Sequence, residues 1–309
     1  MKTEQLRERL LSALLDVCWR QWTAIGVAGV RRSEAAAIDP EALAMITLVA
    51  GRHDARLFDE MLDWLVVNPG LVDIARFERM SKRFPEPQQR LARVVLTKLA
   101  ESGRATLRQV AYGASVANEG AGSYSLEPLF LGEAGRKAVS WTGRDEDFAR
   151  AGFDRGVIEL RGMSMAPDAA SPAAIRFRAR ALVGLGARAE VLTYLWKHDW
   201  AHGRRIAQAS AYPQSSVADY LSSLAGAKLA DQRVEGRKVL YRLSSSLADI
   251  GRSESRYVDW VLAFPAVAAV LGALTPVDAP DEVRWIRLET ALREAASGLA
   301  AEGLDVIVP

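Results

Sequence analysis

The sequence predicts a mainly α-helical fold of two or three domains. Apolar residues recur at helical spacing through most of the 309 residues, and hydrophobic residues make up 50% of the chain. A domain usually takes roughly 100–200 residues, so a chain of this length is long enough for more than one. Charged residues make up 25%, and this balance excludes a chain that is disordered throughout.

Several kinds of site are excluded because cysteine and histidine are scarce. Cys18 is the only cysteine, which rules out a disulfide framework and a cysteine-rich zinc cluster and is typical of a reducing cytosol. His198 and His202 are spaced like metal ligands on a helix, but we expect them at a helix end and a short strand, off a common face. The chain also lacks the common nucleotide-binding and nucleophile motifs. We therefore expect a cytoplasmic protein without metal, cofactor, catalytic residues or enzymatic activity.

Residues 1–110 are expected to form a helical domain. Charges come early and no long apolar run follows, so we expect no signal peptide. Asp39 and Pro40 are typical of a helix start, as N-cap and first-turn residue. The apolar spacing predicts helices over 3–25, 40–51, 55–67, 74–84 and 87–101, with a short strand at 71–73.

Residues 111–172 predict a loosely structured connector. They are rich in glycine and serine and are interrupted by proline. Two short apolar pieces, 129–131 and 157–160, are candidates for strands. We expect this connector to cross the surface of the first domain.

Residues 173–245 form the segment that is most informative about function. Their apolar residues switch from helical spacing to strict alternation near the end. A glycine lies between the two alternating runs, which is typical of a hairpin loop. In order, the predicted elements are helices at 173–184 and 187–199, an extended piece at 200–202, helices at 203–210 and 213–229, and a hairpin of 229–234 with 239–244.

This order of elements resembles the winged helix-turn-helix domain of bacterial transcription regulators, of the MarR and ArsR types, over about residues 187–245. The likeness is strongest from Ile206 to Leu243. It rests on the small Ala207 where two helices cross and on the apolar Tyr212 in the turn. It also rests on the inward positions Val217 and Leu221 of the third helix and on the stretch 225–229 that leads into the wing.

The resemblance implies a transcription regulator that binds double-stranded DNA. A helix fits the major groove, where Gln214 can contact adenine, and the hairpin tip puts Arg237 and Lys238 near phosphates. Asp219 departs from the pattern, since an acid repels phosphate but can accept a bond from cytosine. The residues expected to meet DNA are Arg204, Arg205, Gln214, Ser215, Ser216, Asp219, Ser222, Arg233, Arg237 and Lys238.

Two other functions are open on the sequence. One is an antitoxin or adaptor that mainly binds a protein partner and uses the winged helix for autoregulation. The other is a helical enzyme whose site has no recognisable motif. Residues 56–101 are also similar in order to a winged helix, with Gln88, Gln89, Arg90 and Arg93 facing outward, but a plain helical bundle is the interpretation that we prefer because no hairpin is evident after them.

Charge and hydropathy divide the C-terminal part from the segment before it. Residues 187–245 hold nine Lys and Arg against five acidic residues, whereas 246–309 hold five Arg against ten acidic residues. Residues 260–274 are an uncharged run of 15, shorter than the about 20 residues that span a membrane, so we expect no membrane partner. We expect 246–309 to form helices that make a homodimer. The alternative is that these helices pack on residues 1–100 of their own chain.

Overall fold

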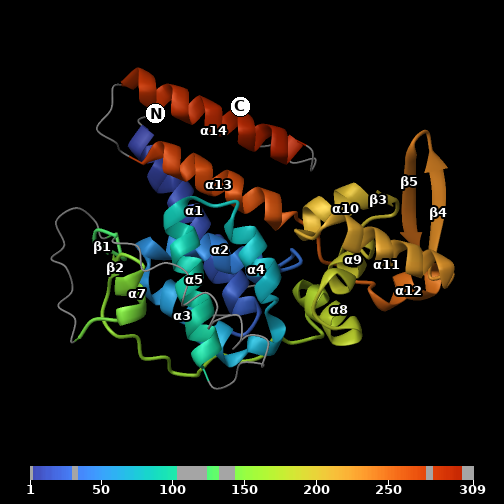
Figure 1. The fold of residues 1–309 in the computed structure, drawn as a ribbon, viewed down its shortest axis with the longest axis horizontal. Coiled ribbons are helices and arrows are strands. Elements are labelled where there is room, and N and C mark those ends of the chain that lie inside the picture. The colour runs from blue at the N-terminus through green and yellow to red at the C-terminus, as the bar shows by residue number, and fades with distance from the viewer. Residues whose placement is uncertain (1–2, 30–33, 103–123, 132–142, 276–280, 301–309) are drawn as a thin grey trace.

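The computed structural model describes residues 3–29, 34–102, 124–131, 143–275 and 281–300. The chain is mainly helical, as predicted, with a large group of helices beside a smaller group of helices and a sheet (Figure 1). No helix in the described part of the chain combines the length and hydrophobicity needed to cross a bilayer.

The large group, which we call the helical body, is built on five N-terminal helices. Aspartates begin three of them: Asp39, Asp54 and Asp73 each accept a hydrogen bond from a first-turn backbone N–H, so the predicted start at Asp39 is confirmed. The bounds of the five helices are α1 (Thr3–Ala24), α2 (Pro40–Ala50), α3 (Ala55–Val67), α4 (Ile74–Ser81) and α5 (Glu86–Glu101).

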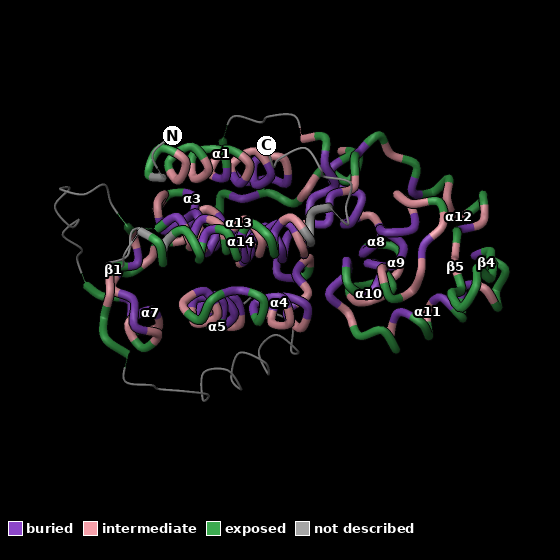
Figure 2. The backbone as a smooth tube through the Cα atoms, turned by 90° about the horizontal axis from the view of Figure 1, so that it is seen from above, coloured by how far each residue is buried: buried purple, intermediate pink, exposed green. Residues whose placement is uncertain are grey.

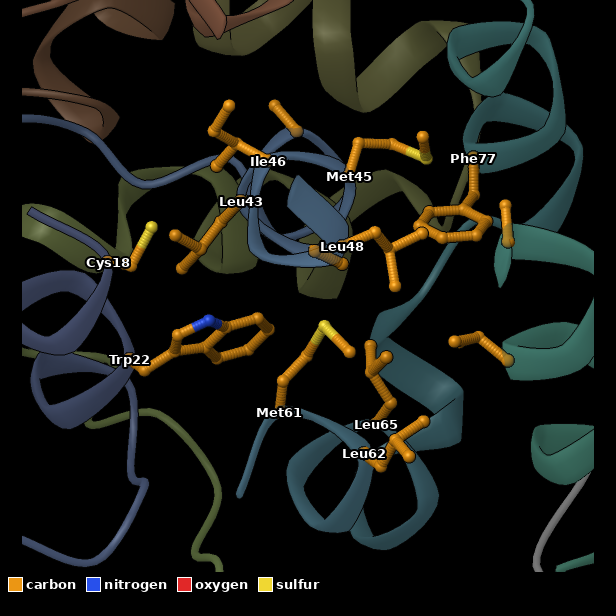
Figure 3. Close-up of a cluster of buried hydrophobic side chains, with 14 of the residues drawn as sticks. Cys18, Trp22, Leu43, Met45, Ile46, Leu48, Met61, Leu62, Leu65 and Phe77 are labelled. Atoms are coloured by element: carbon orange, nitrogen blue, oxygen red, sulfur yellow. The ribbon is translucent and has the colours of Figure 1, made fainter. Parts of the chain in front are cut away.

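The core of the helical body lies around α2, whose side chains are buried on nearly every side (Figure 3). Trp22 from α1 and Trp64 from α3 meet there, with ring centroids 5.3 Å apart. Both indoles are satisfied: Trp22 donates to the Thr47 hydroxyl at 2.9 Å, and Trp64 donates to the Ile25 carbonyl at 2.8 Å. Because both indole N–H groups have a hydrogen-bond partner, burial of these two large rings leaves no polar group unpaired.

Residues 56–101 differ in two respects from the winged-helix alternative, over which a plain helical bundle was preferred. The predicted strand at 71–73 is absent, because Pro69–Leu71 form a 3-10 turn and Asp73 already caps α4. Gln88 does not face outward but is 9% exposed, and Arg90 turns inward to donate to the Ala151 carbonyl. These helices belong to the bundle around α2.

The connector is described only in part, since 111–123 and 132–142 lie outside the described residues. It contains two short parallel strands, β1 (Glu127–Pro128) and β2 (Phe153–Asp154), and the helix α7 (Glu146–Arg150). The expected strands at 129–131 and 157–160 are therefore misplaced. Further on, the connector is fixed to α3, because Asp63 accepts hydrogen bonds from the backbone of Gly162 and from Ser164.

The smaller group, which we call the helix–sheet group, follows the connector. Its sheet is antiparallel with strand order β3-β5-β4, so the first strand pairs with the last. A separate hydrophobic cluster forms beneath this sheet, with Val191, Ile206, Val217 and Leu221 buried in it. The bounds are α8 (Ile175–Val183), α9 (Ala187–Leu195), β3 (Ala201–His202), α10 (Gly203–Ser210), α11 (Gln214–Gly226), β4 (Ala230–Glu235), β5 (Lys238–Leu243) and α12 (Ser245–Ile250).

The last two helices return to the helical body. α13 (Trp260–Leu274) packs against α1 and α2 and buries Phe264 and Leu271 in their core. α14 (Asp281–Ala300) packs on α13 (Figure 1). The apolar run of α13 is therefore covered by its own chain, which is the alternative to the expected dimer interface. α14 still leaves Trp285 and Ile286 more than 60% exposed.

Candidate nucleic-acid interface

α11 has one buried side and one polar side. Val217, Leu221 and Leu224 recur at helical spacing and face the core. The predicted contact residues of this helix lie on its outer surface: Gln214, Ser215, Asp219 and Ser222 are exposed, and Ser216 is half-buried. Among the described residues no lysine or arginine forms an ion pair with Asp219.

The N-terminus of α11 is open to an incoming group. It begins after Pro213, which has no backbone N–H and caps nothing with its side chain. The first backbone N–H groups of a helix have no partner within the helix, so those of Gln214 to Ser216 point out of its end. Together with the exposed Gln214 side chain, they form a cluster of hydrogen-bond donors suited to an anion.

α10 contributes one exposed arginine and one engaged arginine. Arg204 is exposed, as is Gln208 one turn later on the same side. Arg205 instead forms an ion pair with Asp259, the N-cap of α13, at 3.2 Å. Burial raises the pKa of Asp259, although Arg205 opposes that shift. Arg205 therefore also joins α10 to the helical body. Gln208, in contrast, is an exposed polar residue of this surface that was not predicted from the sequence.

The hairpin of β4 and β5 projects from the group and ends in a basic tip (Figure 1). Glu235 pairs with Lys238, leaving Gly236 and Arg237 as the loop. Gly236 has a φ of +59°, as the first loop residue of a tight hairpin turn requires, and glycine adopts it without steric cost. Arg237 and Lys238 are exposed, and within the described residues neither forms an ion pair.

Arg233, in contrast, is engaged on the hairpin. Its guanidinium lies 4.3 Å from the ring centre of Trp200 and forms an ion pair with Glu235 at 2.7 Å. Arg242 approaches the same ring at 4.7 Å and pairs with Asp231 at 2.9 Å. Of the predicted hairpin contacts, Arg237 and Lys238 therefore have more freedom to meet an anion than Arg233.

The turn between α10 and α11 is fastened to α4. The backbone carbonyls of Ser210 and Ala211 accept hydrogen bonds from Arg76 at 2.7 Å and from Arg79 at 2.9 Å. Arg79 also stacks over the ring of Tyr212, 4.3 Å from its centre, and the Tyr212 hydroxyl donates to Asp73. Ala211 itself has a φ of +56°, a left-handed conformation that costs a non-glycine residue about 1–2 kcal/mol. The contacts from α4 help to hold this conformation.

Behind the turn lies a buried network of three arginines and three carboxylates. Its members come from α2 and its N-cap, from α4, and from α8 and α9, and each is at most 5% exposed. Arg76 pairs with Glu41 at 2.6 Å, and Arg180 bridges Glu41 at 2.7 Å and Glu190 at 2.9 Å. The full set is Asp39, Glu41, Arg76, Arg176, Arg180 and Glu190.

The network keeps Asp39 ionised although this side chain is buried. Burial alone would raise the pKa of Asp39, but Arg176 and Arg76 together hold it far below its usual value. The network joins two helices of the body to the first two helices of the helix–sheet group. Since α11 packs on α9, the network anchors the support of α11 to the body.

No protein-family model matches this chain, and no curated protein or solved structure is significantly similar to it. In the described part of the chain, no cluster of His, Cys, Asp and Glu is arranged to hold a metal ion. Function is therefore inferred from the residues of this surface.

Proposed function

We propose that this protein is a cytoplasmic, sequence-specific transcriptional regulator that binds double-stranded DNA through a winged helix formed by α9 to β5. The observation that carries the proposal is the placement of an exposed polar helix face beside a hairpin with a basic tip. The packing of α11 against β4 supports it too, because the hairpin then lies next to this helix, as a wing does in a winged helix.

The chemistry of each part suits a different part of the duplex. The Gln214 amide can pair with an adenine edge in the major groove, and Ser215 can serve either base pair. Arg204 and the free N–H groups at the start of α11 can hold phosphates on either side. Arg237 and Lys238 can reach the backbone or the minor groove. The Asp219 carboxylate would accept a hydrogen bond from a cytosine amino group and would repel a phosphate placed beside it.

Binding to DNA from upstream of the protein's own gene tests this function. Gln214→Ala should cost about 1–3 kcal/mol on the true site, because one base contact is lost, and should barely change binding to random DNA. Fluorescence anisotropy at two salt concentrations measures both. Ser223→Ala is the control, since that hydroxyl already bonds to the Asp219 carbonyl in the same helix. Absence of binding at low salt would refute the proposal.

A second function, an antitoxin or adaptor that mainly binds a protein, is favoured by exposed apolar side chains. Trp285 and Ile286 on α14 are 62% and 63% exposed, and Val234 on the hairpin is 74% exposed. Covering such side chains with a partner lowers the free energy of the complex, because apolar surface leaves water. Under the first function, the partner that covers α14 would instead be a second copy of this chain, because paired winged helices read two half-sites. A tight complex with a different protein, without any DNA binding, would favour the adaptor instead.

A further inference from the structure

The end of α4 and the residues after it carry three basic side chains within five positions. Arg79, Lys82 and Arg83 lie there, and Arg79 touches the turn that leads into α11. α5, α4, α10 and α11 lie in a row along one side of the molecule (Figure 2). The helical body therefore continues the surface on which the proposed recognition helix lies.

These charges differ from the other arginines of the junction. Arg76, three residues before Arg79, is buried against the carboxylates of Asp39 and Glu41. Arg79 and Arg83 have no carboxylate within 4.0 Å among the described residues. Lys82 pairs only with Glu78, at 3.8 Å, and both side chains are largely in water, where such a pair contributes little. Arg79 is half-buried under Tyr212, whereas Lys82 and Arg83 are exposed and leave positive charge at the surface.

The spacing from α11 fits the dimensions of DNA. The Arg79 side chain bonds to the Ala211 carbonyl, and Gln214 follows Ala211 by three positions, a span of at most about 11 Å. The major groove is about 12 Å wide and 8.5 Å deep, which places its rim phosphates about 10 Å from the centre of its floor. A side chain beside Ala211 can therefore reach the phosphate rim when Gln214 reads the floor.

We propose that the end of α4, through the exposed Lys82 and Arg83, binds the phosphate backbone of the same duplex beside the α11 contact. The helical body is then part of the DNA interface as well as the support of the winged helix. This inference rests on the proposed function, and it adds a contact surface outside the winged helix.

The test replaces Lys82 and Arg83 with glutamine and measures DNA affinity as a function of salt. Each lost phosphate contact should lower the slope of log K against log salt by about 1, so the double variant should lose about 2, equally on specific and random DNA. On a duplex trimmed to the bases under α11 and the hairpin, the variant and the wild type should bind alike. Arg79 is left intact because it holds the turn.

Two controls keep the test specific. Arg83 also donates to the Val261 carbonyl at 3.3 Å, so Lys82→Gln alone is measured as well, with a thermal melt of each variant. Arg293→Gln removes an exposed charge from α14, a helix that packs on α13. An unchanged slope, or a loss that persists on the trimmed duplex, would overturn the inference while leaving DNA binding intact. Failure of the wild type to bind any DNA would instead overturn the proposed function, and this inference with it.

Discussion

Tyr212, in the turn before α11, donates its phenolic hydrogen to the carboxylate of Asp73 at the start of α4. The same carboxylate accepts a hydrogen bond from the backbone N–H of Arg76 at 3.0 Å and so caps α4. One acidic side chain therefore fixes both a helix of the body and the turn of the helix–sheet group. Burial, reinforced by Asp73, raises the pKa of Tyr212 above its ordinary value.

Tyr212→Phe should lower the free energy of unfolding by about 1.5–3 kcal/mol, because a hydrogen bond to a charged group is lost. The stabilisation that depends on the Tyr212 proton is complete below about pH 10, where the unfolded side chain ionises, and is lost as the pH rises toward the higher folded pKa. The difference between wild type and variant should therefore shrink above pH 10. Urea unfolding from pH 7 to 11 measures it, with Tyr241→Phe as the control, and a constant difference would contradict the prediction.

Glu190→Ala should cost about 3–5 kcal/mol, because Arg176 and Arg180 would keep their buried charges without this partner. The matched control is Glu289→Ala, which breaks an exposed pair with Arg293 and should change stability by less than about 1 kcal/mol. Chemical denaturation of both variants gives the comparison. Similar losses in the two would show that the buried pairs are worth no more than surface ones.

Arg237→Ala combined with Lys238→Ala should weaken binding to all DNA sequences alike and lower the salt slope by about 2. Both side chains are exposed at the hairpin tip, so the fold should be unaffected. Arg252→Ala, at a side chain that is 84% exposed after α12, serves as the control. If the slope stays the same, the hairpin tip does not touch DNA.

Trp285→Ser with Ile286→Ser should convert a dimer to a monomer, since these side chains are the most exposed large apolar groups among the α14 residues whose burial is described. The buried side of α14, with Leu288 and Ala291, is left intact for packing on α13. Light scattering on the full-length protein and the variant measures the mass. A wild-type monomer at high protein concentration would rule out the homodimer, and a variant that stays dimeric would place the interface elsewhere.

The features that follow from local chemistry could be predicted from the sequence. The helix start at Asp39 and Pro40, the break before Pro213 and the hairpin turn at Gly236 each depend on a few neighbouring residues, and all three are present. The inward side of α11 follows from the spacing of its apolar residues. The assignment of this unit to a winged-helix family, and its contact with DNA, stay predictions.

What the sequence could not predict depends on residues that are far apart along the chain. Arg180 and Glu41 are separated by 139 positions, and nothing in either neighbourhood indicates the other. Arg205 was expected at DNA, but its partner Asp259 comes from a helix that docks on the body. Gln88 was expected outside because helical spacing gives the period of a face and not which face is covered. The basic run at 79–83 was a visible signal that the sequence analysis missed.

The buried network also bears on how the chain unfolds. The part of the network from the body has two carboxylates and one guanidinium, Asp39, Glu41 and Arg76, so it carries one excess negative charge. The part from α8 and α9 has two guanidinium groups and one carboxylate, so it carries one excess positive charge. Only the joined network is neutral. An intermediate with one part folded and the other unfolded must therefore either bury an uncompensated charge or open its own surface to water. Such intermediates are disfavoured, so the two hydrophobic clusters should melt together in a single cooperative transition.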